Sequence, residues 1–219
     1  MSLKKAFTLA EVLITLGVIG VVAAMTLPVL FNSIEKTITV NKLKRAMAEV
    51  NQGYRMGFTE NGAMTERDLT NVTPKDYFDT YWKPYFKVSQ FCLTGPECGY
   101  ATNKPFKSKN GTRNATLMTQ RSNVSYITNN GFFYLFQPRA GVSGNIAQHT
   151  ILVDINGSKL PNTFCKDVFI FRVTADGSMF MPAGYGLSDS AISNGGTYGD
   201  YCAELIRRAN WKITKDYPW

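Results

Sequence analysis

Residues 7–31 constrain the fold most, because they form an apolar run broken by one charge. They read FTLAEVLITLGVIGVVAAMTLPVLF, and the only ionisable side chain among them is Glu11. As a helix, the run would be roughly 37 Å long, enough to cross a hydrocarbon core of about 30 Å. A carboxylate inside a membrane costs roughly 2.5–3.5 kcal/mol on insertion scales. We therefore expect Glu11 to have a partner and a functional role.

The flanks of the run indicate its orientation. Lys4 and Lys5 precede it, and basic residues stay on the cytoplasmic side of a membrane span. The bulk of the chain is then expected outside the cytoplasm. The alternative is a secretory signal cleaved after Ala23 or Ala24, which would leave Glu11 unexplained.

The N-terminal segment, KKAFTLAEVLITLGVIGVVAAMTLP (residues 4–28), resembles that of type IV pilins and type II secretion pseudopilins. The resemblance covers about residues 1–55. It implies that a prepilin peptidase removes the leader, residues 1–6, between Ala6 and Phe7, and that Phe7 is then N-methylated. Ala6 departs from the glycine usual at this position, which bears on the efficiency of cleavage.

The same resemblance implies an assembly role for Glu11, the fifth residue counted from Phe7. The α-amino group of a new N-terminus has an ordinary pKa of about 7.7–8.0 and is largely cationic at neutral pH. A carboxylate on one subunit would offset the desolvation of that ammonium on its neighbour. Gly20 and Pro28 fall where many pilins loosen this helix, and Pro28 lacks the amide hydrogen that a helix needs. We therefore predict a kink near these two residues.

Beyond the membrane span, the helix is predicted to continue to about Gly57. Its proposed buried stripe consists of Ile34, Ile38, Leu43, Met47, Val50 and Tyr54, with charged residues between them. The predicted organisation is a leader (1–6), a long helix (7–57) with a transmembrane half (7–31), and an extracytoplasmic domain (58–219).

The remaining residues predict an α+β domain, with the long helix packed on a small antiparallel sheet as in pilins. Asn130-Gly131 and Asp176-Gly177 lie between β-rich runs and predict hairpins. Residues 74–88 predict a short aromatic-rich helix, and residues 201–210 predict another helix.

The four cysteines, Cys92, Cys98, Cys165 and Cys202, favour two disulfides in an oxidising compartment. Three pairings are open on the sequence alone. Cys92–Cys98 would close a local loop, and Cys165–Cys202 would then tie the last strand region to the C-terminal helix. The resemblance supports this second bridge, because pilins have a disulfide-bounded region near the C-terminus.

Residues typical of catalysis are scarce, and we predict no enzyme activity and no resident cofactor. His149 is the only histidine, and no common catalytic or phosphate-binding motif is present. Asp154-Ile155-Asn156-Gly157 resembles the front of a calcium loop, without a glutamate at the closing position. Asp154, Asn156 and Asp167 are therefore candidate calcium ligands, and a plain Asn-Gly turn is the alternative.

Charge is unevenly distributed along this chain of net charge +8. Residues 99–152 contain no Asp or Glu. The basic residues there are Lys104, Lys107, Lys109, Arg113, Arg121 and Arg139, with Tyr100 and Phe106 interleaved. Such a segment could bind DNA or another polyanion by neutralising phosphates. A solvated basic loop or a subunit contact is the alternative.

These observations predict a structural subunit of a type IV pilus-like or type II secretion pseudopilus filament. It would reside in a bacterial inner membrane with its domain in the periplasm, and lie in the periplasm or outside the cell once in a filament. Its expected partners are further copies of itself, other pilin-like subunits and a prepilin peptidase. The alternatives are a minor pilin that binds DNA and a monomeric, membrane-tethered binding domain.

Overall fold

The structure is a computed structural model that describes residues 8–62, 73–102, 105–110, 113–114, 124–137 and 149–219. The contacts between residues divide the chain into two units, residues 1–38 and residues 39–219. Each unit is described by itself below.

The longest element is helix α1, Leu9–Asn61. At 1.5 Å rise per residue, its 53 residues would extend for about 80 Å. The helical assignment is unbroken at Gly20 and Pro28, and the kink expected there stays a prediction. The helix ends at Asn61, four residues beyond the expected Gly57. The next residue, Gly62, has a left-handed φ of 73°. Gly62 donates its amide hydrogen to the carbonyl of Phe58 at 2.9 Å, a common way for a helix to end.

The second half of α1 buries one face. That face consists of Thr39, Val40, Leu43, Ala46, Val50, Gly53, Tyr54 and Gly57. The predicted stripe is confirmed at Leu43, Val50 and Tyr54, whereas Met47 is only partly buried. It is wrong at Ile34 and Ile38, which are 45% and 47% exposed. The physical reason is that the compact unit begins at Thr39, so these two residues have no core to enter.

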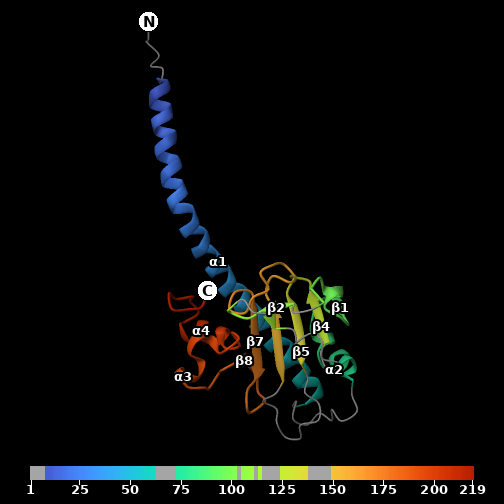
Figure 1. Ribbon diagram of the computed structural model, residues 1–219. Coiled ribbons are helices and arrows are strands. Elements are labelled where there is room, and N and C mark those ends of the chain that lie inside the picture. Colours follow the sequence, from blue (N-terminus) through green and yellow to red (C-terminus); the bar gives the residue numbers. More distant parts are fainter. Residues whose placement is uncertain (1–7, 63–72, 103–104, 111–112, 115–123, 138–148) are drawn as a thin grey trace. The chain divides into compact units, whose positions relative to one another are not determined.

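A six-stranded antiparallel sheet forms the centre of the second unit (Figure 1). In spatial order its strands are β1 (Val88–Cys92), β4 (Val124–Thr128), β5 (Phe133–Gln137), β6 (Thr150–Asp154), β7 (Val168–Val173) and β8 (Phe180–Pro182). A separate two-stranded sheet consists of β2 (Phe106–Lys107) and β3 (Arg113–Asn114). The α+β fold class is therefore confirmed.

Short helices complete this unit. The α-helices are α2 (Pro74–Tyr81), α3 (Asp189–Ile192) and α4 (Cys202–Arg208), and the 3-10 helices are η2 (Lys83–Tyr85), η3 (Pro96–Cys98) and η5 (Ser193–Gly195). The helices expected within residues 74–88 and 201–210 are both present.

Both expected hairpins form. The Asn130-Gly131 turn joins β4 to β5, and the Asp176-Gly177 turn joins β7 to β8. Strand β1, which pairs with β4 at one edge of the sheet, was not expected from the sequence.

The two faces of the sheet are covered by different parts of the chain. On one face, Phe136 packs on Trp82 and Phe78, with ring centroids 4.4 and 5.7 Å apart. On the other, Phe133 packs on Tyr100 at 4.5 Å and on Phe106 at 6.3 Å. This division follows from the alternation of side chains along a strand, since positions 133 and 136 point in opposite directions.

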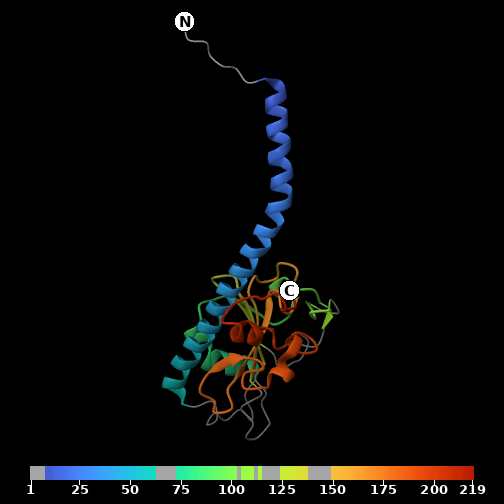
Figure 2. The same cartoon turned by 90° about the vertical axis from the view of Figure 1, so that its left-hand side faces the viewer.

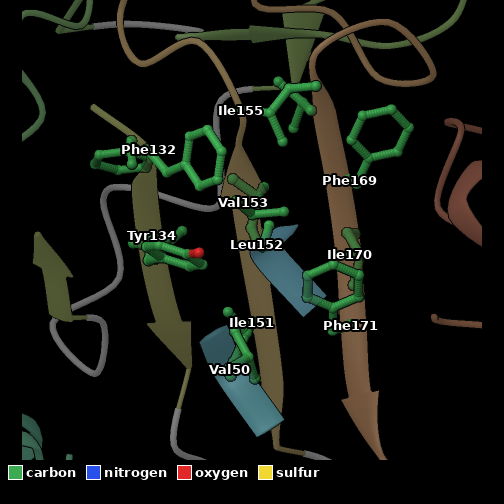
Figure 3. Close-up of a cluster of buried hydrophobic side chains, with 14 of the residues drawn as sticks. Val50, Phe132, Tyr134, Ile151, Leu152, Val153, Ile155, Phe169, Ile170 and Phe171 are labelled. Atoms are coloured by element: carbon green, nitrogen blue, oxygen red, sulfur yellow. The ribbon is translucent and has the colours of Figure 1, made fainter. Parts of the chain in front are cut away.

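Helix α1 joins the sheet through its second half. The side-chain amide of Asn51 donates to the carbonyl of Phe180 and accepts from its amide, both at 2.8 Å. The hydroxyl of Tyr54 donates to the carbonyl of Gly177. Residues 39–61 and the sheet lie side by side in both views (Figures 1 and 2). Figure 3 shows Val50 of α1 gathered with buried side chains of β5, β6 and β7.

Two disulfides close parts of the second unit. Cys92 is bonded to Cys98, and Cys165 is bonded to Cys202. This is the pairing that the local spacing and the pilin resemblance favoured. The second bridge connects the β6–β7 loop to the first turn of α4 and closes a segment of sequence separation 37.

Candidate functional site

The first half of α1 exposes apolar side chains around its whole circumference. None of residues 8–38 is buried, and Leu9, Leu13, Leu16, Met25 and Phe31 are all exposed by 60% or more. Among the described residues, α1 is the helix long and apolar enough to cross a membrane. An exposed apolar surface of this extent is costly in water.

Glu11 and Thr8 cap the start of this half reciprocally. The Oε2 atom of Glu11 accepts from the amide and from the hydroxyl of Thr8, both at 2.8 Å. In return, the Oγ1 atom of Thr8 accepts from the amide of Glu11 at 3.3 Å. This is a capping box, in which two amides at a helix start that would otherwise lack partners are both satisfied.

Glu11 thus has a local structural role that the sequence interpretation did not name. The signal was present as Thr-x-x-Glu directly before an apolar run, the sequence signature of a capping box. Both hydrogen bonds from Thr8 use Oε2. Within the part of the chain that the structure describes, the other oxygen, Oε1, has no hydrogen-bond partner and remains available to a group from outside. A capping role alone does not require the negative charge, since Gln also occupies this position in capping boxes.

The basic segment is only partly described. Lys104, Arg121 and Arg139 lie outside the described residues, and Arg113 is described only through its backbone in β3. Lys107 lies opposite Arg113 in the two-stranded sheet. Lys109 is half-buried, and its ammonium donates to the carbonyl of Asn194 at 2.5 Å. Lys109 is therefore engaged in holding η5, which weakens its assignment to a ligand-binding patch.

The aromatic residues expected to accompany this patch do not belong to it. Tyr100 and Phe106 are 3% and 0% exposed, and their rings lie 5.3 Å apart against Phe133. The interpretation of these two side chains as part of a basic, aromatic surface is therefore wrong. They cover one face of the sheet, so they cannot stack on the bases of a nucleic acid.

A second candidate site lies between β6 and β7, where the three candidate calcium ligands come together. The Oδ1 atom of Asp154 accepts from the amide of Asn156 at 3.2 Å, and Asp167 accepts from the side-chain amide of Asn156 at 3.2 Å. Tyr100 donates its hydroxyl hydrogen to Asp154 at 3.1 Å. Asp154 and Asp167 are both buried, with 0% and 5% of their surface exposed.

Burial dominates the electrostatics of this cluster. It raises the pKa of Asp154 well above its usual range, and the charge of Asp167 raises it further. Burial also raises the pKa of Asp167, although hydrogen bonds from the amides of Asn162 and Thr163 and from the side chain of Asn156 favour its charged form. The pKa of Tyr100 is raised by burial and by the neighbouring Asp154. Two carboxyl groups therefore share an interior that disfavours their ionisation.

The described ranges contain no group of three or more His, Cys, Asp or Glu side chains that could hold a metal ion. Any ion held between β6 and β7 would need amide and carbonyl oxygens as well. Comparisons of the chain with protein-family models, with curated proteins and with solved structures found no match. The functional argument therefore rests on the residues and their geometry.

Proposed function

We propose that this chain is a structural subunit of a type IV pilus-like or type II secretion pseudopilus filament and assembles through α1. One observation carries the proposal: a single helix packs its residues 39–61 on the domain of the same chain, whereas its residues 9–38, which include the apolar run up to residue 31, have no buried side chain. Lipid before assembly, and identical helices after it, would cover the first half. The N-terminal resemblance to pilins supports this choice.

The proposal includes processing and location. A prepilin peptidase would cleave between Ala6 and Phe7, and Phe7 would be N-methylated. The subunit would wait in a bacterial inner membrane with its domain in the periplasm, where the two disulfides can form. It would then join a filament with further copies of itself and with other pilin-like subunits.

Glu11 is proposed to pair with the α-ammonium of Phe7 on a neighbouring subunit. Its free Oε1 atom and its negative charge both suit that partner. The capping box offers a competing explanation of the same residue, because it accounts for the carboxylate within one chain. An experiment must therefore separate the charge of Glu11 from its ability to accept a hydrogen bond.

Three variants make this separation. Glu11→Gln keeps a capping acceptor and removes the charge, Thr8→Ala keeps the charge and removes the reciprocal cap, and Glu11→Ala removes both functions of the carboxylate. Each is expressed in the native host, where filament yield is measured by shearing and membrane insertion by fractionation. We expect Glu11→Gln and Glu11→Ala to insert normally and to lose filaments, and Thr8→Ala to retain most of the yield.

Normal filament yield from Glu11→Gln would contradict the intersubunit pairing and leave capping as the role of Glu11. Normal yield from Glu11→Ala would remove the carboxylate from assembly altogether. A chain that stays monomeric and keeps residues 1–6 would instead support a membrane-tethered binding domain.

Binding of DNA or another polyanion is a second candidate, favoured by one observation. The amide of Lys107 donates to the carbonyl of Asn162 at 2.8 Å, so β2 adjoins the loop that carries the exposed Lys159 and Lys166. Two further basic residues therefore belong to a loop that adjoins the segment expected from the sequence. Charge reversal at Lys159 and Lys166 tests it without disturbing Lys109: salt-sensitive retention on duplex DNA should fall if the surface binds phosphates.

A further inference from the structure

The loop between β6 and β7 presents an exposed leucine together with two lysines. Leu160 is 79% exposed, the same fraction as Leu9 in the apolar half of α1. Lys159 directly precedes the leucine, and Lys166 is exposed in the same loop. The base of the loop is fixed by Asp167, which is buried and accepts from two backbone amides of the loop at 2.9 and 2.6 Å. The leucine and the lysines therefore lie on a held loop that offers both apolar surface and positive charge.

This loop lies at the end of the domain where α1 enters it. The hydroxyl of Tyr54 donates to the carbonyl of Gly177, in the turn between β7 and β8. Lys42, about three helical turns earlier in α1, is instead close enough for its charge to act on Asp154, the last residue of β6. From its entry, α1 therefore runs from the β6–β7 loop toward the β7–β8 turn. Both views show this loop at the end where α1 enters (Figures 1 and 2).

Residues 211–219 lie at the same end of the domain. The Nζ atom of Lys44 is 5.4 Å from the centre of the Trp211 ring. The hydroxyl of Tyr217 donates to the carbonyl of Cys165 in the β6–β7 loop at 2.7 Å. The exposed charged residues of this segment are Lys212, Lys215 and Asp216. Basic side chains from α1, from the β6–β7 loop and from residues 211–219 thus occur at one end of the domain.

The chain ties this end of the domain closely to the apolar run. The run ends at Phe31, the compact unit begins at Thr39, and the helical assignment is unbroken between them. Along a helix, the distance from residue 31 to residue 39 is about 12 Å. The headgroup layer on each side of the hydrocarbon core is roughly 5–8 Å thick. If residues 7–31 span a bilayer, the entry end of the domain is therefore tethered within a short distance of the headgroups.

We infer that the β6–β7 loop docks on the surface of the membrane that α1 spans, with anionic phospholipid as its partner. Lys159 and Lys166 neutralise headgroup phosphates, and Leu160 enters the boundary between headgroups and acyl chains. The inference rests on the part of the proposed function that places residues 7–31 in a membrane, and not on filament assembly. It gives the domain a lipid-binding surface of its own, in addition to the anchor.

The combination of charge and apolar surface favours lipid over other anionic partners. Asp167 is the only acidic residue in the loop, residues 155–167, and it is buried. The loop therefore presents only positive charge to solvent. A single exposed leucine is common on soluble proteins. Beside Lys159, however, it matches the interface of a bilayer, where a lysine reaches the phosphates and an apolar side chain lies deeper. A polyanion such as DNA would use the lysines and leave the leucine in water.

Hydrogen exchange of the full chain in nanodiscs, followed by mass spectrometry, tests the inference. Discs that hold one chain each are made from phosphatidylcholine alone or from equal parts of phosphatidylcholine and phosphatidylglycerol. We expect residues 157–163 to exchange at least about 5-fold more slowly in the anionic discs, the factor expected for one lysine near an anionic surface. Residues 174–178, in the β7–β8 turn, should exchange equally in both. High salt should reduce the difference, because it screens exposed charges.

Matched charge reversals identify the groups responsible. Lys159→Glu and Arg55→Glu each convert an exposed basic residue to an acid, and Arg55 lies next to Tyr54 in the part of α1 that adjoins the β7–β8 turn. We expect Lys159→Glu to lose the protection in anionic discs and Arg55→Glu to keep it. Leu160→Ser should lower the protection as well. Unchanged protection in Leu160→Ser would contradict the entry of the leucine into the interface. The comparison of lipids and salt uses the wild type and does not depend on any variant folding.

The outcomes separate this inference from the proposed function. Equal exchange of residues 157–163 in both kinds of disc, in a chain that resists alkaline extraction, would overturn the inference and leave filament assembly unaffected. If Lys159→Glu then lowered retention on duplex DNA, the lysines would belong to the polyanion surface. Lipid-dependent protection in a chain that forms no filaments would contradict the proposed assembly and support the inference. A chain released from membranes by alkali would overturn the membrane premise that both share.

Discussion

The two halves of α1 have the same secondary structure and opposite surroundings. Residues 39–61 bury a stripe that includes Leu43, Ala46 and Val50 against the domain, whereas residues 9–38 have no buried side chain. The glycines show the same contrast. A Cβ atom on Gly53 would meet Phe86 at 2.4 Å, whereas one on Gly20 would have nothing within 4 Å.

The difference shows that a residue's place in a helix does not decide whether its side chain packs on the domain of the same chain. In the second half, glycine permits close packing on the domain of the same chain. In the first half, the same residue type lies in an apolar surface that the chain does not cover. Small residues are common where membrane helices approach one another closely. This agrees with a first half that packs on other helices.

The largest expected effect on the free energy of unfolding comes from removing a disulfide. Both disulfides lie in the second unit, and residues 9–38 of α1 contain no cysteine. Removing Cys165–Cys202 by double substitution to serine should lower the free energy of unfolding by about 4 kcal/mol, because the bridge closes a long segment. Removing the short-range Cys92–Cys98 bridge should cost about 2 kcal/mol. Denaturant unfolding is followed by tryptophan fluorescence. All three tryptophans (Trp82, Trp211 and Trp219) belong to the second unit.

The prediction depends most on which of the two disulfide variants loses more stability. An equal or larger loss from the Cys92–Cys98 variant would contradict the view that the long-range bridge constrains the unfolded chain more. The helical circular dichroism of residues 9–38 in micelles should be unchanged in both variants.

A matched pair of leucines compares the halves directly. Leu43 is 0% exposed and Leu16 is 61% exposed. Leu43→Ala removes buried methyl groups and should lower the free energy of unfolding of the domain by about 2–5 kcal/mol. Leu16→Ala should change it by less than about 0.5 kcal/mol. Similar losses in the two variants, measured by the same fluorescence assay, would show that residue 16 also supports the domain.

The two glycines give the smallest expected effect. Gly53→Ala places a methyl group against the ring of Phe86 and should destabilise the domain by about 1–3 kcal/mol through overpacking. Gly20→Ala meets no atom of the chain and removes the helix penalty of glycine, so the domain should keep its stability. Thermal unfolding in micelles measures both. If Gly53→Ala unfolds at the wild-type temperature, the helix and Phe86 adjust more easily than proposed.

Features encoded by neighbouring residues were predictable from the sequence. The apolar run predicted a long helix, and the Asn-Gly and Asp-Gly steps predicted two hairpins, because turn geometry depends on adjacent residues. The reciprocal cap of Thr8 and Glu11 is equally local. The membrane and assembly roles expected of Glu11 do not involve this cap, which follows only from its position three residues after Thr8.

Features that depend on long-range packing were not predictable. Nothing local separates the exposed Ile38 from the buried Leu43, since both lie in one apolar pattern and only the start of the compact unit distinguishes them. Tyr100 and Phe106 lie in a polar segment, and only the sheet face carrying Phe133 explains their burial. The approach of Asn162 to Asp154 likewise depends on how the β6–β7 loop closes.

The central claim is that the chain is processed before Phe7 and then assembles through the exposed half of α1. The most direct test is an intact mass with N-terminal peptide mapping, made on the protein purified from its native membranes. The account predicts a chain that begins with N-methylated Phe7. A chain that keeps Met1, or that begins after Ala24, would contradict it.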